Sequence, residues 1–235
     1  VLSLYDYTGE ALKPWADAGH ECYAFDIQHD PHEITKEYYH RIGNGSIEYH
    51  YADLHDPQSF ADIKRTLPFM DQPVIFGMAF PVCTDLAVSG AMHFKKKKQA
   101  DPLFQYKAMQ HVFDCANTFI KMKCTYMIEN PVSVLATMWR EPDYRFHPYE
   151  YGGYIPEDQA EHPVWPEYIA PRDAYPKKTC LWTDYRFVMP PMLPVEPEQG
   201  FSRQHLKLGG KSAKTKNIRS ATPRGFARAV MEANV

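Results

Sequence analysis

The sequence lacks the features of a membrane-spanning or disulfide-stabilised protein. No apolar run approaches the roughly 18 residues that suggest a transmembrane helix, and no basic segment followed by an apolar leader marks a secretory signal. The five cysteines are odd in number, and no two have CxxC spacing. We therefore expect a protein of the reducing cytoplasm, with no membrane partner, no disulfide framework and no metal site.

The formal net charge of −3 conceals a basic segment near the end of the chain. Residues 203–228 carry basic side chains and no acidic ones: Arg203, Lys207, Lys211, Lys214, Lys216, Arg219, Arg224 and Arg228. Such a segment on an acidic protein indicates an anionic partner on one side of the molecule, or a solvated tail. The four lysines at positions 95–98 allow the same two interpretations, solvated surface or contact with a nucleic-acid backbone.

Short apolar runs alternate with helical patterns in the first half of the chain, which predicts an α/β fold with a parallel sheet. Strands are predicted at residues 1–5, 22–25, 47–51, 74–76 and 126–128, and helices at 11–18, 60–67, 101–122 and 224–233. Residues 29–46 are predicted to form a loop with surface histidines at His29, His32 and His40. The helix at 101–122 has the clearest apolar face: Ala108, Val112, Phe113, Ala116, Phe119 and Ile120.

Residues 139–200 hold 11 of the 20 prolines and many aromatic side chains. Because proline fixes φ and removes a backbone donor, this stretch predicts an irregular lobe or a lid rather than regular helices or central strands. Its aromatic side chains either stack on bases or pack an ordinary core. The expected organisation is an α/β core at 1–138, an irregular Pro/Tyr-rich lobe with a basic loop at 139–217, and a C-terminal segment at 218–235 that returns to the core.

Cys83 follows the predicted strand at 74–76, in the sequence Phe80-Pro81-Val82-Cys83. In α/β sheets the chemistry lies beyond the carboxyl ends of the strands. A second predicted strand ends in Glu129 and Asn130. A thiol and a carboxyl group on two such loops suit nucleophilic attack assisted by an acid, although a lone cysteine is more often a buried apolar residue.

These two segments resemble the catalytic proline–cysteine loop and the glutamate–asparagine motif of the cytosine carbon-5 DNA methyltransferases. More narrowly, the chain is similar to the short methyltransferase-like proteins of bacteriophages and mobile elements. The resemblance extends from Tyr5 to Pro223, with the motifs in the family's order. It implies a Rossmann-like, doubly wound S-adenosylmethionine-dependent methyltransferase sheet, and the cytoplasm of a bacterial host if the chain is phage-encoded.

The resemblance also implies roles for individual residues. Cys83 would add to carbon 6 of cytosine, Glu129 would bind ring nitrogen 3 and the amino group, and Asn130 would hold its loop or touch the base. Lys178, in the segment 175–182, is the best match for the family's base-contacting arginine. Together with Thr84 and Ser89, it is the expected substrate-binding set.

The implied cofactor is S-adenosylmethionine. The residues expected around it are Tyr5, Thr8, Gly9, Asp26, Ile27, Asp53, Leu54, Pro81, Ser220 and Thr222. Among these, Asp26 would hold the ribose, Ile27 would pack on the adenine and Asp53 would meet the adenine amino group. From the residues alone, Asp26 equally suits a helix N-cap and Asp53 the start of a turn.

Several features depart from the family's pattern. Tyr7 stands where the family has glycine, Val82 where it has proline, and Thr84 where it has glutamine. Residues 183–217 are also too few for a large recognition domain. Three functions therefore stay open: methylation of carbon 5 of cytosine in duplex or single-stranded DNA, the same chemistry on a free pyrimidine nucleotide, and a catalytically decayed protein that binds nucleic acid or cofactor.

Overall fold

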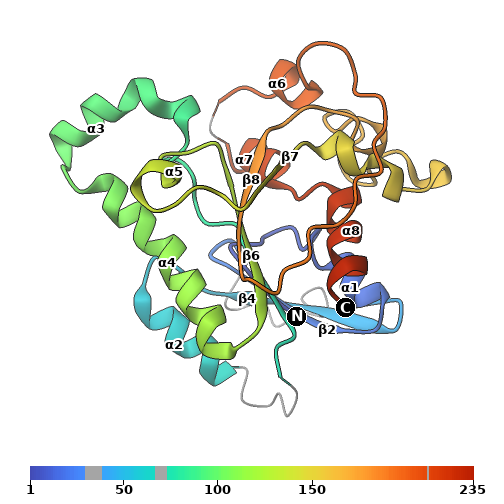
Figure 1. Cartoon of the computed structure of the whole chain (residues 1–235), viewed down its shortest axis with the longest axis horizontal. Helices are drawn as coiled ribbons and strands as arrows, with labels where there is room; N and C mark the ends of the chain where they lie inside the picture. Colours follow the sequence, from blue (N-terminus) through green and yellow to red (C-terminus); the bar gives the residue numbers. More distant parts are fainter. Residues whose placement is uncertain (30–38, 67–72, 211) are drawn as a thin grey trace.

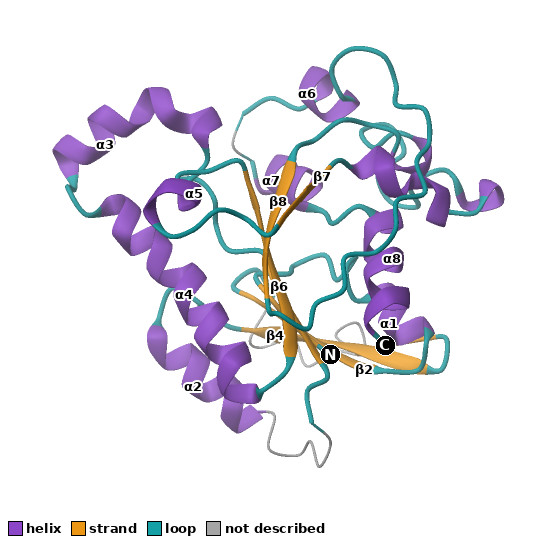
Figure 2. Cartoon of the chain, viewed as in Figure 1, coloured by secondary structure: helices purple, strands orange, loops and turns teal. Residues whose placement is uncertain are grey.

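The computed structural model describes residues 1–29, 39–66, 73–210 and 212–235. Within these residues, one mixed sheet of eight strands has the order β3-β4-β2-β1-β5-β6-β8-β7 (Figures 1 and 2). The strands are β1 (Leu2–Leu4), β2 (Glu21–Asp26), β3 (Tyr39–Ile42), β4 (Gly45–Tyr51), β5 (Phe76–Ala79), β6 (Thr125–Pro131), β7 (Tyr144–Phe146) and β8 (Thr179–Thr183). Strands β4, β2, β1, β5 and β6 are parallel, whereas β3 and β8 run antiparallel to their neighbours.

The order of the strands reverses at β1, which pairs with β2 on one side and with β5 on the other. This is the arrangement of a doubly wound sheet, in which ligands bind beyond the carboxyl ends of the strands at the point of reversal. The predicted α/β fold with a mostly parallel sheet is therefore confirmed. The loops after β1 and β5 are the two that meet at this point.

Helices cover both faces of the sheet (Figure 2). Cores form on opposite faces, one containing side chains of α2 and α4 and the other side chains of α1 and α8. The helices are α1 (Lys13–Asp17), α2 (Pro57–Thr66), α3 (Phe94–Ala100), α4 (Phe104–Met122), α5 (Leu135–Met138), α6 (Arg203–Lys207), α7 (Ala213–Ser220) and α8 (Arg224–Asn234). None of the helices in these described ranges is both long and apolar enough to cross a bilayer.

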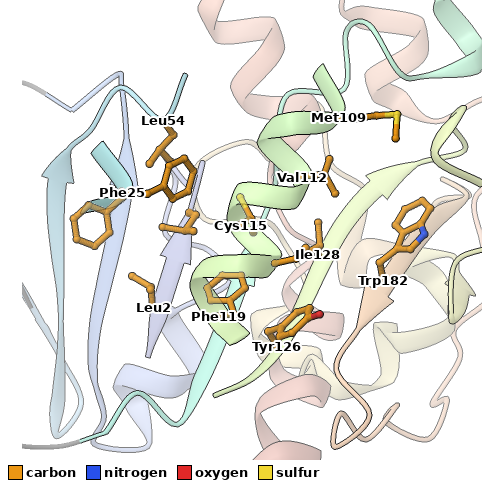
Figure 3. Packing of buried hydrophobic residues seen from close by; sticks show 14 of the residues in the cluster. Leu2, Phe25, Leu54, Met109, Val112, Cys115, Phe119, Tyr126, Ile128 and Trp182 are labelled. Atoms are coloured by element: carbon orange, nitrogen blue, oxygen red, sulfur yellow. The ribbon is translucent and has the colours of Figure 1, made fainter. Parts of the chain in front are cut away.

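Helix α4 forms the centre of the first core (Figure 3). Val112, Cys115 and Phe119 are fully buried against the sheet. A Cβ atom on Gly77 of β5 would lie 2.3 Å from Cδ1 of Phe119, so a residue without a side chain is needed there. Ile120 was predicted on the apolar face, but it is 58 % exposed. It lies about 100° around the helix from Phe119, outside the buried stripe.

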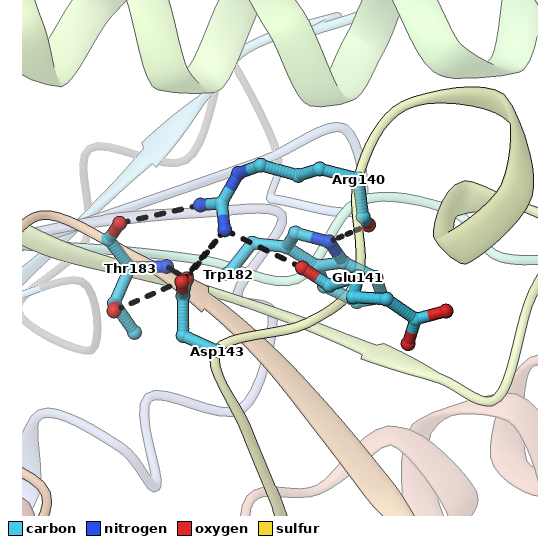
Figure 4. A network of polar contacts seen from close by, with 5 residues as sticks. All are labelled: Arg140, Glu141, Asp143, Trp182 and Thr183. Carbon is cyan, nitrogen blue, oxygen red and sulfur yellow. Dashed lines mark hydrogen bonds and ion pairs between the residues drawn. The ribbon is translucent and has the colours of Figure 1, made fainter.

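The expectation of no central strands in 139–200 is wrong, because this stretch supplies β8, which pairs with both β6 and β7 in the main sheet. The five residues of β8 contain no proline, so they can pair on both sides. A network of polar contacts links β8 to the segment just before β7 (Figure 4). The Asp143 carboxylate accepts hydrogen bonds from Arg140 Nη1 (2.7 Å) and Thr183 N (2.7 Å), and Trp182 Nε1 donates to Arg140 O (2.9 Å).

The loop predicted at 29–46 is also wrong in its described second half. There, β3 pairs antiparallel with β4, which begins at Gly45. His29 was predicted at the surface but is buried, since its ring packs on Tyr7 and Tyr49. His32 and the side chain of His40 lie outside the described part of the chain.

The predicted basic loop near the C-terminus contains two short helices, α6 and α7. Serine N-caps begin both: Ser202 Oγ accepts from His205 N (3.3 Å) and Ser212 Oγ from Thr215 N (3.2 Å). Ile218 of α7 is fully buried in a small third core. The basic side chains of the described part of this segment are therefore carried on the helices α6, α7 and α8 rather than on a tail.

Candidate active site

Cys83 lies in the loop after β5, at the point where the sheet reverses. Phe80 N donates to Leu4 O (3.0 Å), which continues the pairing with β1 just past the end of β5. Cys83 O accepts from Leu86 N (3.0 Å) and Ala87 N (2.8 Å), so a tight turn follows the cysteine. The Cys83 side chain is half-buried, whereas the other four cysteines are buried. Cys83 is therefore the most accessible thiol of the chain.

Asn130 fastens this loop to the end of β6. Its side chain is buried and Nδ2 donates to Pro81 O at 3.1 Å. Two backbone hydrogen bonds continue the connection, from Val88 N to Val132 O (3.0 Å) and from Val134 N to Leu86 O (2.9 Å). Of the two roles predicted for Asn130, this geometry supports the one in which it holds the loop.

The Cys83 thiol, the Glu129 carboxyl group and the Lys177 ammonium group are electrostatic neighbours. Burial raises the pKa of Cys83, the charge of Glu129 raises it further, and the charge of Lys177 lowers it. Burial also raises the pKa of Glu129, and Lys177 again opposes the shift. The sequence-predicted pair of thiol and carboxyl group is thus brought together, with one cation that was not predicted.

Lys177 rather than Lys178 faces this pair. Lys177 Nζ donates to Arg219 O (2.9 Å), and its side chain lines a small cavity with Glu129 and Thr222. Lys178 is exposed, and its charge acts on Cys180, whose pKa it lowers against the effect of burial. Side chains alternate along an extended chain, and Thr179 lines the same cavity as Lys177. That alternation is the sequence signal that could have separated the two lysines.

A buried aspartate that the sequence analysis missed organises the loop after β1. Asp6 Oδ1 accepts from Gly9 N (2.8 Å), and Asp6 Oδ2 accepts from Ser3 Oγ (2.8 Å). Burial raises the pKa of Asp6 to about 6. Gly9 has φ +65°, and a Cβ atom there would lie 2.3 Å from the hydroxyl oxygen of Tyr49. Glycine is therefore required at this position by backbone geometry and by packing against β4.

Two expected cofactor residues border this loop. Tyr5 adopts φ 58° and donates its hydroxyl hydrogen to Leu54 O (2.7 Å). Thr8 is half-buried, and its hydroxyl lies 3.4 Å from Asp6 Oδ1. Tyr7, at the family's glycine position, is 40 % exposed and stacks on His29.

Asp26, the residue predicted to hold a ribose, ends β2. Asp26 Oδ1 accepts from the backbone N (2.8 Å) and side-chain Nε2 (3.3 Å) of Gln28, so Asp26 forms a turn rather than a helix cap. No hydrogen bond from the described residues reaches Asp26 Oδ2. Ile27 beside it is 48 % exposed, which is unusual for an isoleucine at a strand end.

The other predicted cofactor residues have mixed placements. Asp53 Oδ1 accepts from His55 N (3.0 Å), which is the turn that was its alternative role. Leu54 is buried in the core, and Pro81 is buried with its carbonyl bonded to Asn130. Thr222 lines the cavity beside Glu129, but Ser220 is exposed at the end of α7.

Two predicted substrate residues lie on the surface next to Cys83. Thr84 is exposed, and its carbonyl oxygen accepts from Lys97 Nζ (3.3 Å). Ser89 is exposed in the 3-10 helix η2 (Val88–His93). Both could meet a substrate that approaches the thiol from solvent.

No protein-family model matches the chain. A search of curated proteins likewise finds no significant match.

Proposed function

We propose that the protein is an S-adenosylmethionine-dependent methyltransferase that acts on carbon 5 of cytosine in DNA through a covalent adduct with Cys83. One observation carries this proposal: a half-buried thiol and a half-buried carboxyl group lie at the carboxyl ends of two adjacent parallel strands, and the charge of one lysine acts on both. The strands adjoin the reversal point of a doubly wound sheet, where such folds bind their ligands. The motif order from Tyr5 to Pro223 agrees with it.

In the proposed reaction, the Cys83 thiolate forms a carbon–sulfur bond to carbon 6 of the pyrimidine. The electron pair displaced onto the ring makes carbon 5 nucleophilic. S-adenosylmethionine, when bound, would supply the electrophilic methyl group for carbon 5, and its sulfur would keep the electron pair of the carbon–sulfur bond that breaks. Removal of the carbon-5 proton then returns an electron pair to the ring, and the bond to Cys83 breaks. No residue is assigned as the base for that proton.

Glu129 and Lys177 have complementary roles in this scheme. Burial raises the pKa of Glu129, so this group takes up a proton more readily than an exposed carboxyl group, and it can then donate a hydrogen bond to ring nitrogen 3 as negative charge develops on the ring. The positive charge of Lys177 stabilises the Cys83 thiolate against burial. Asn130 is a positioning residue, because it fixes the Cys83 loop to β6.

The chain's own residues fit the cofactor at its ribose end. A carboxylate at the end of the second parallel strand is the group that takes ribose hydroxyls in nucleotide-binding sheets, and Asp26 Oδ2 has no bond to any described residue. The exposed Ile27 side chain offers an apolar surface for a flat ring. Asp26 and Ile27 would thus hold the ribose and the adenine.

A free pyrimidine nucleotide is the second candidate substrate. The observation that favours it is the small size of the segment between β8 and α8. Residues 184–223 contain α6 and α7 and, within the described residues, no strand. A large recognition domain for a DNA sequence therefore has no place there.

Methyl transfer from radiolabelled S-adenosylmethionine tests the proposal. Duplex DNA, single-stranded DNA and deoxycytidine monophosphate are incubated in parallel with the protein and with Cys83→Ser. We expect label in DNA that is lost in Cys83→Ser, with the methyl group on cytosine after digestion to nucleosides. Label only in the mononucleotide would move the function to the second candidate. No label in any pool would contradict both.

A further inference from the structure

Three exposed lysines lie on α3, the helix that follows the Cys83 loop, and form no ion pair with the described residues. In α3, Lys95, Lys96 and Lys98 are exposed, and no acidic side chain of the described residues pairs with them. Like charges three residues apart on a helix destabilise it slightly. Lys97 differs, since its Nζ forms an ion pair with Asp85 and donates to Thr84 O. Lys97 thus anchors α3 beside Cys83 and leaves the other three lysines facing solvent.

A second basic surface borders the site. Lys207, Lys214, Lys216 and Arg219 of α6 and α7 are all exposed. This unit is connected to the site, because Lys177 Nζ donates to Arg219 O (2.9 Å) and Arg219 Nη2 donates to Leu208 O (2.6 Å). The two surfaces adjoin the same site, because Lys97 holds α3 to the Cys83 loop and Arg219 of α7 is bonded to Lys177, which lines a cavity with Glu129.

The second surface also presents an aromatic side chain. Phe201, just before α6, is 69 % exposed, and its ring stacks on His205 with the centroids 4.7 Å apart. An exposed aromatic ring on the same surface as several cations is the combination with which proteins bind single-stranded nucleic acid, since every base offers a face for stacking. Phe201 lies outside the three hydrophobic cores of the described residues.

We propose that α3, α6 and α7 form a clamp for the phosphate backbone of a polynucleotide, with Phe201 stacking on one of its bases. Lysine contacts phosphate as a point charge, whereas base edges are read mainly by the forked groups of arginine, asparagine and glutamine. The exposed cations of α3 are all lysines. The α3 side of the clamp therefore holds a strand with little regard to sequence. This inference rests on the proposed function for the identity of the target.

Binding without cofactor tests the clamp separately from methyl transfer. The affinity of fluorescent single-stranded DNA, duplex DNA and RNA is measured by anisotropy over a range of salt concentrations. The variant Lys95→Gln/Lys98→Gln is compared with Lys121→Gln/Lys123→Asn, a control at the far end of α4. For single strands, each lost phosphate contact reduces the magnitude of the salt slope, the slope of log affinity against log salt concentration, by about 0.7. We expect the α3 variant to lower it by about 1.4, the control to leave it unchanged, and Phe201→Ala to weaken binding about tenfold.

Equal slopes for the α3 variant and the control, with all proteins folded by circular dichroism, would overturn the clamp. An affinity for the polynucleotides that does not change with salt concentration would also overturn it. If the protein transfers no methyl group but the α3 variant still loses binding, the clamp is supported and the proposed methyltransferase activity is contradicted. The comparison among the three nucleic acids identifies which strand the clamp holds, because Phe201 favours unpaired bases.

Discussion

Two opposite charges act on the Cys83 thiol, and their balance affects its pKa and hence its reactivity. Burial and Glu129 both disfavour the thiolate, while Lys177 favours it. At neutral pH the free protein therefore holds mostly the thiol. A nucleophile in this state gains reactivity as pH rises, and also when a ligand neutralises Glu129.

Alkylation of Cys83 by iodoacetamide measures this balance directly. Glu129→Gln removes a negative charge, so we expect a lower pKa of Cys83 and faster alkylation at a given pH. Lys177→Met removes the opposing positive charge, so we expect a higher pKa and slower alkylation, with about a tenfold change in thiolate for each pKa unit. The rate is followed against pH by mass spectrometry of the Cys83 peptide.

Lys178→Met is the matched control, because Lys178 acts on Cys180 rather than on Cys83. We expect it to leave the alkylation profile of Cys83 unchanged. If Lys178→Met slowed the reaction as much as Lys177→Met, the assignment of the lysine beside Cys83 would be wrong.

At the scale of elements, α8 depends on one close contact with the irregular lobe. A Cβ atom on Gly225 would lie 2.2 Å from the carbonyl oxygen of Tyr151, in the 3-10 helix η3 (Pro148–Tyr154). Gly225 N also donates to the buried Asp173 Oδ2 at 3.0 Å. Glycine therefore lets α8 approach the lobe closely.

We expect Gly225→Ala to destabilise the protein, although alanine is the better helix former. The overpacked contact costs about 1–3 kcal/mol in the free energy of unfolding, measured by urea denaturation. Gly209→Ala is the control, because nothing lies within 4 Å of a Cβ atom there. A Gly225→Ala protein as stable as the control would show that α8 does not pack as described.

The longer elements could be predicted from the sequence, and the short or irregular ones could not. The apolar period of α4 and the βαβ opening from β1 to β2 are strong local signals, and both elements are present. The strand predicted at 74–76 is observed two residues later, as β5, because the apolar run continues through Met78 and Ala79. Strands β3 and β7 have four and three residues; β3 pairs with β4 across a two-residue turn, whereas the pairing of β7 depends on β8, which is distant in sequence.

At the scale of the whole molecule, the sheet topology brings the predicted site residues together. Cys83 and Glu129 were predicted from motifs at strand ends, and parallel pairing of β5 with β6 makes them neighbours. Lys177 and Asp6 were missed, because their roles depend on which face of an extended segment is buried and on a carboxylate inside a loop. No short motif in the sequence indicates the role of Lys177 or of Asp6.

Cofactor binding should stabilise the whole fold, since a ligand that binds only the native state adds to the free energy of unfolding. At about 100 times its dissociation constant, S-adenosylmethionine should add about 2.7 kcal/mol, or about 5–10 °C in Tm for a chain of this size. We expect Asp26→Asn to about halve this shift, because it keeps the acceptor for Gln28 but removes the charge. Asp17→Asn, an exposed change on α1, should leave the shift intact. An unchanged shift in Asp26→Asn would contradict the ribose assignment.

The most direct test of the central claim is to trap the covalent adduct. In an oligonucleotide with 5-fluorocytosine, fluorine replaces the carbon-5 proton, so the final elimination cannot occur and the bond to Cys83 persists. The protein is incubated with this oligonucleotide and S-adenosylmethionine, and its peptides are analysed by mass spectrometry. We predict a methylated fluorocytosine adduct on Cys83 that is absent from Cys83→Ser. The same protein binding cofactor and oligonucleotide but forming no adduct would contradict nucleophilic catalysis by Cys83.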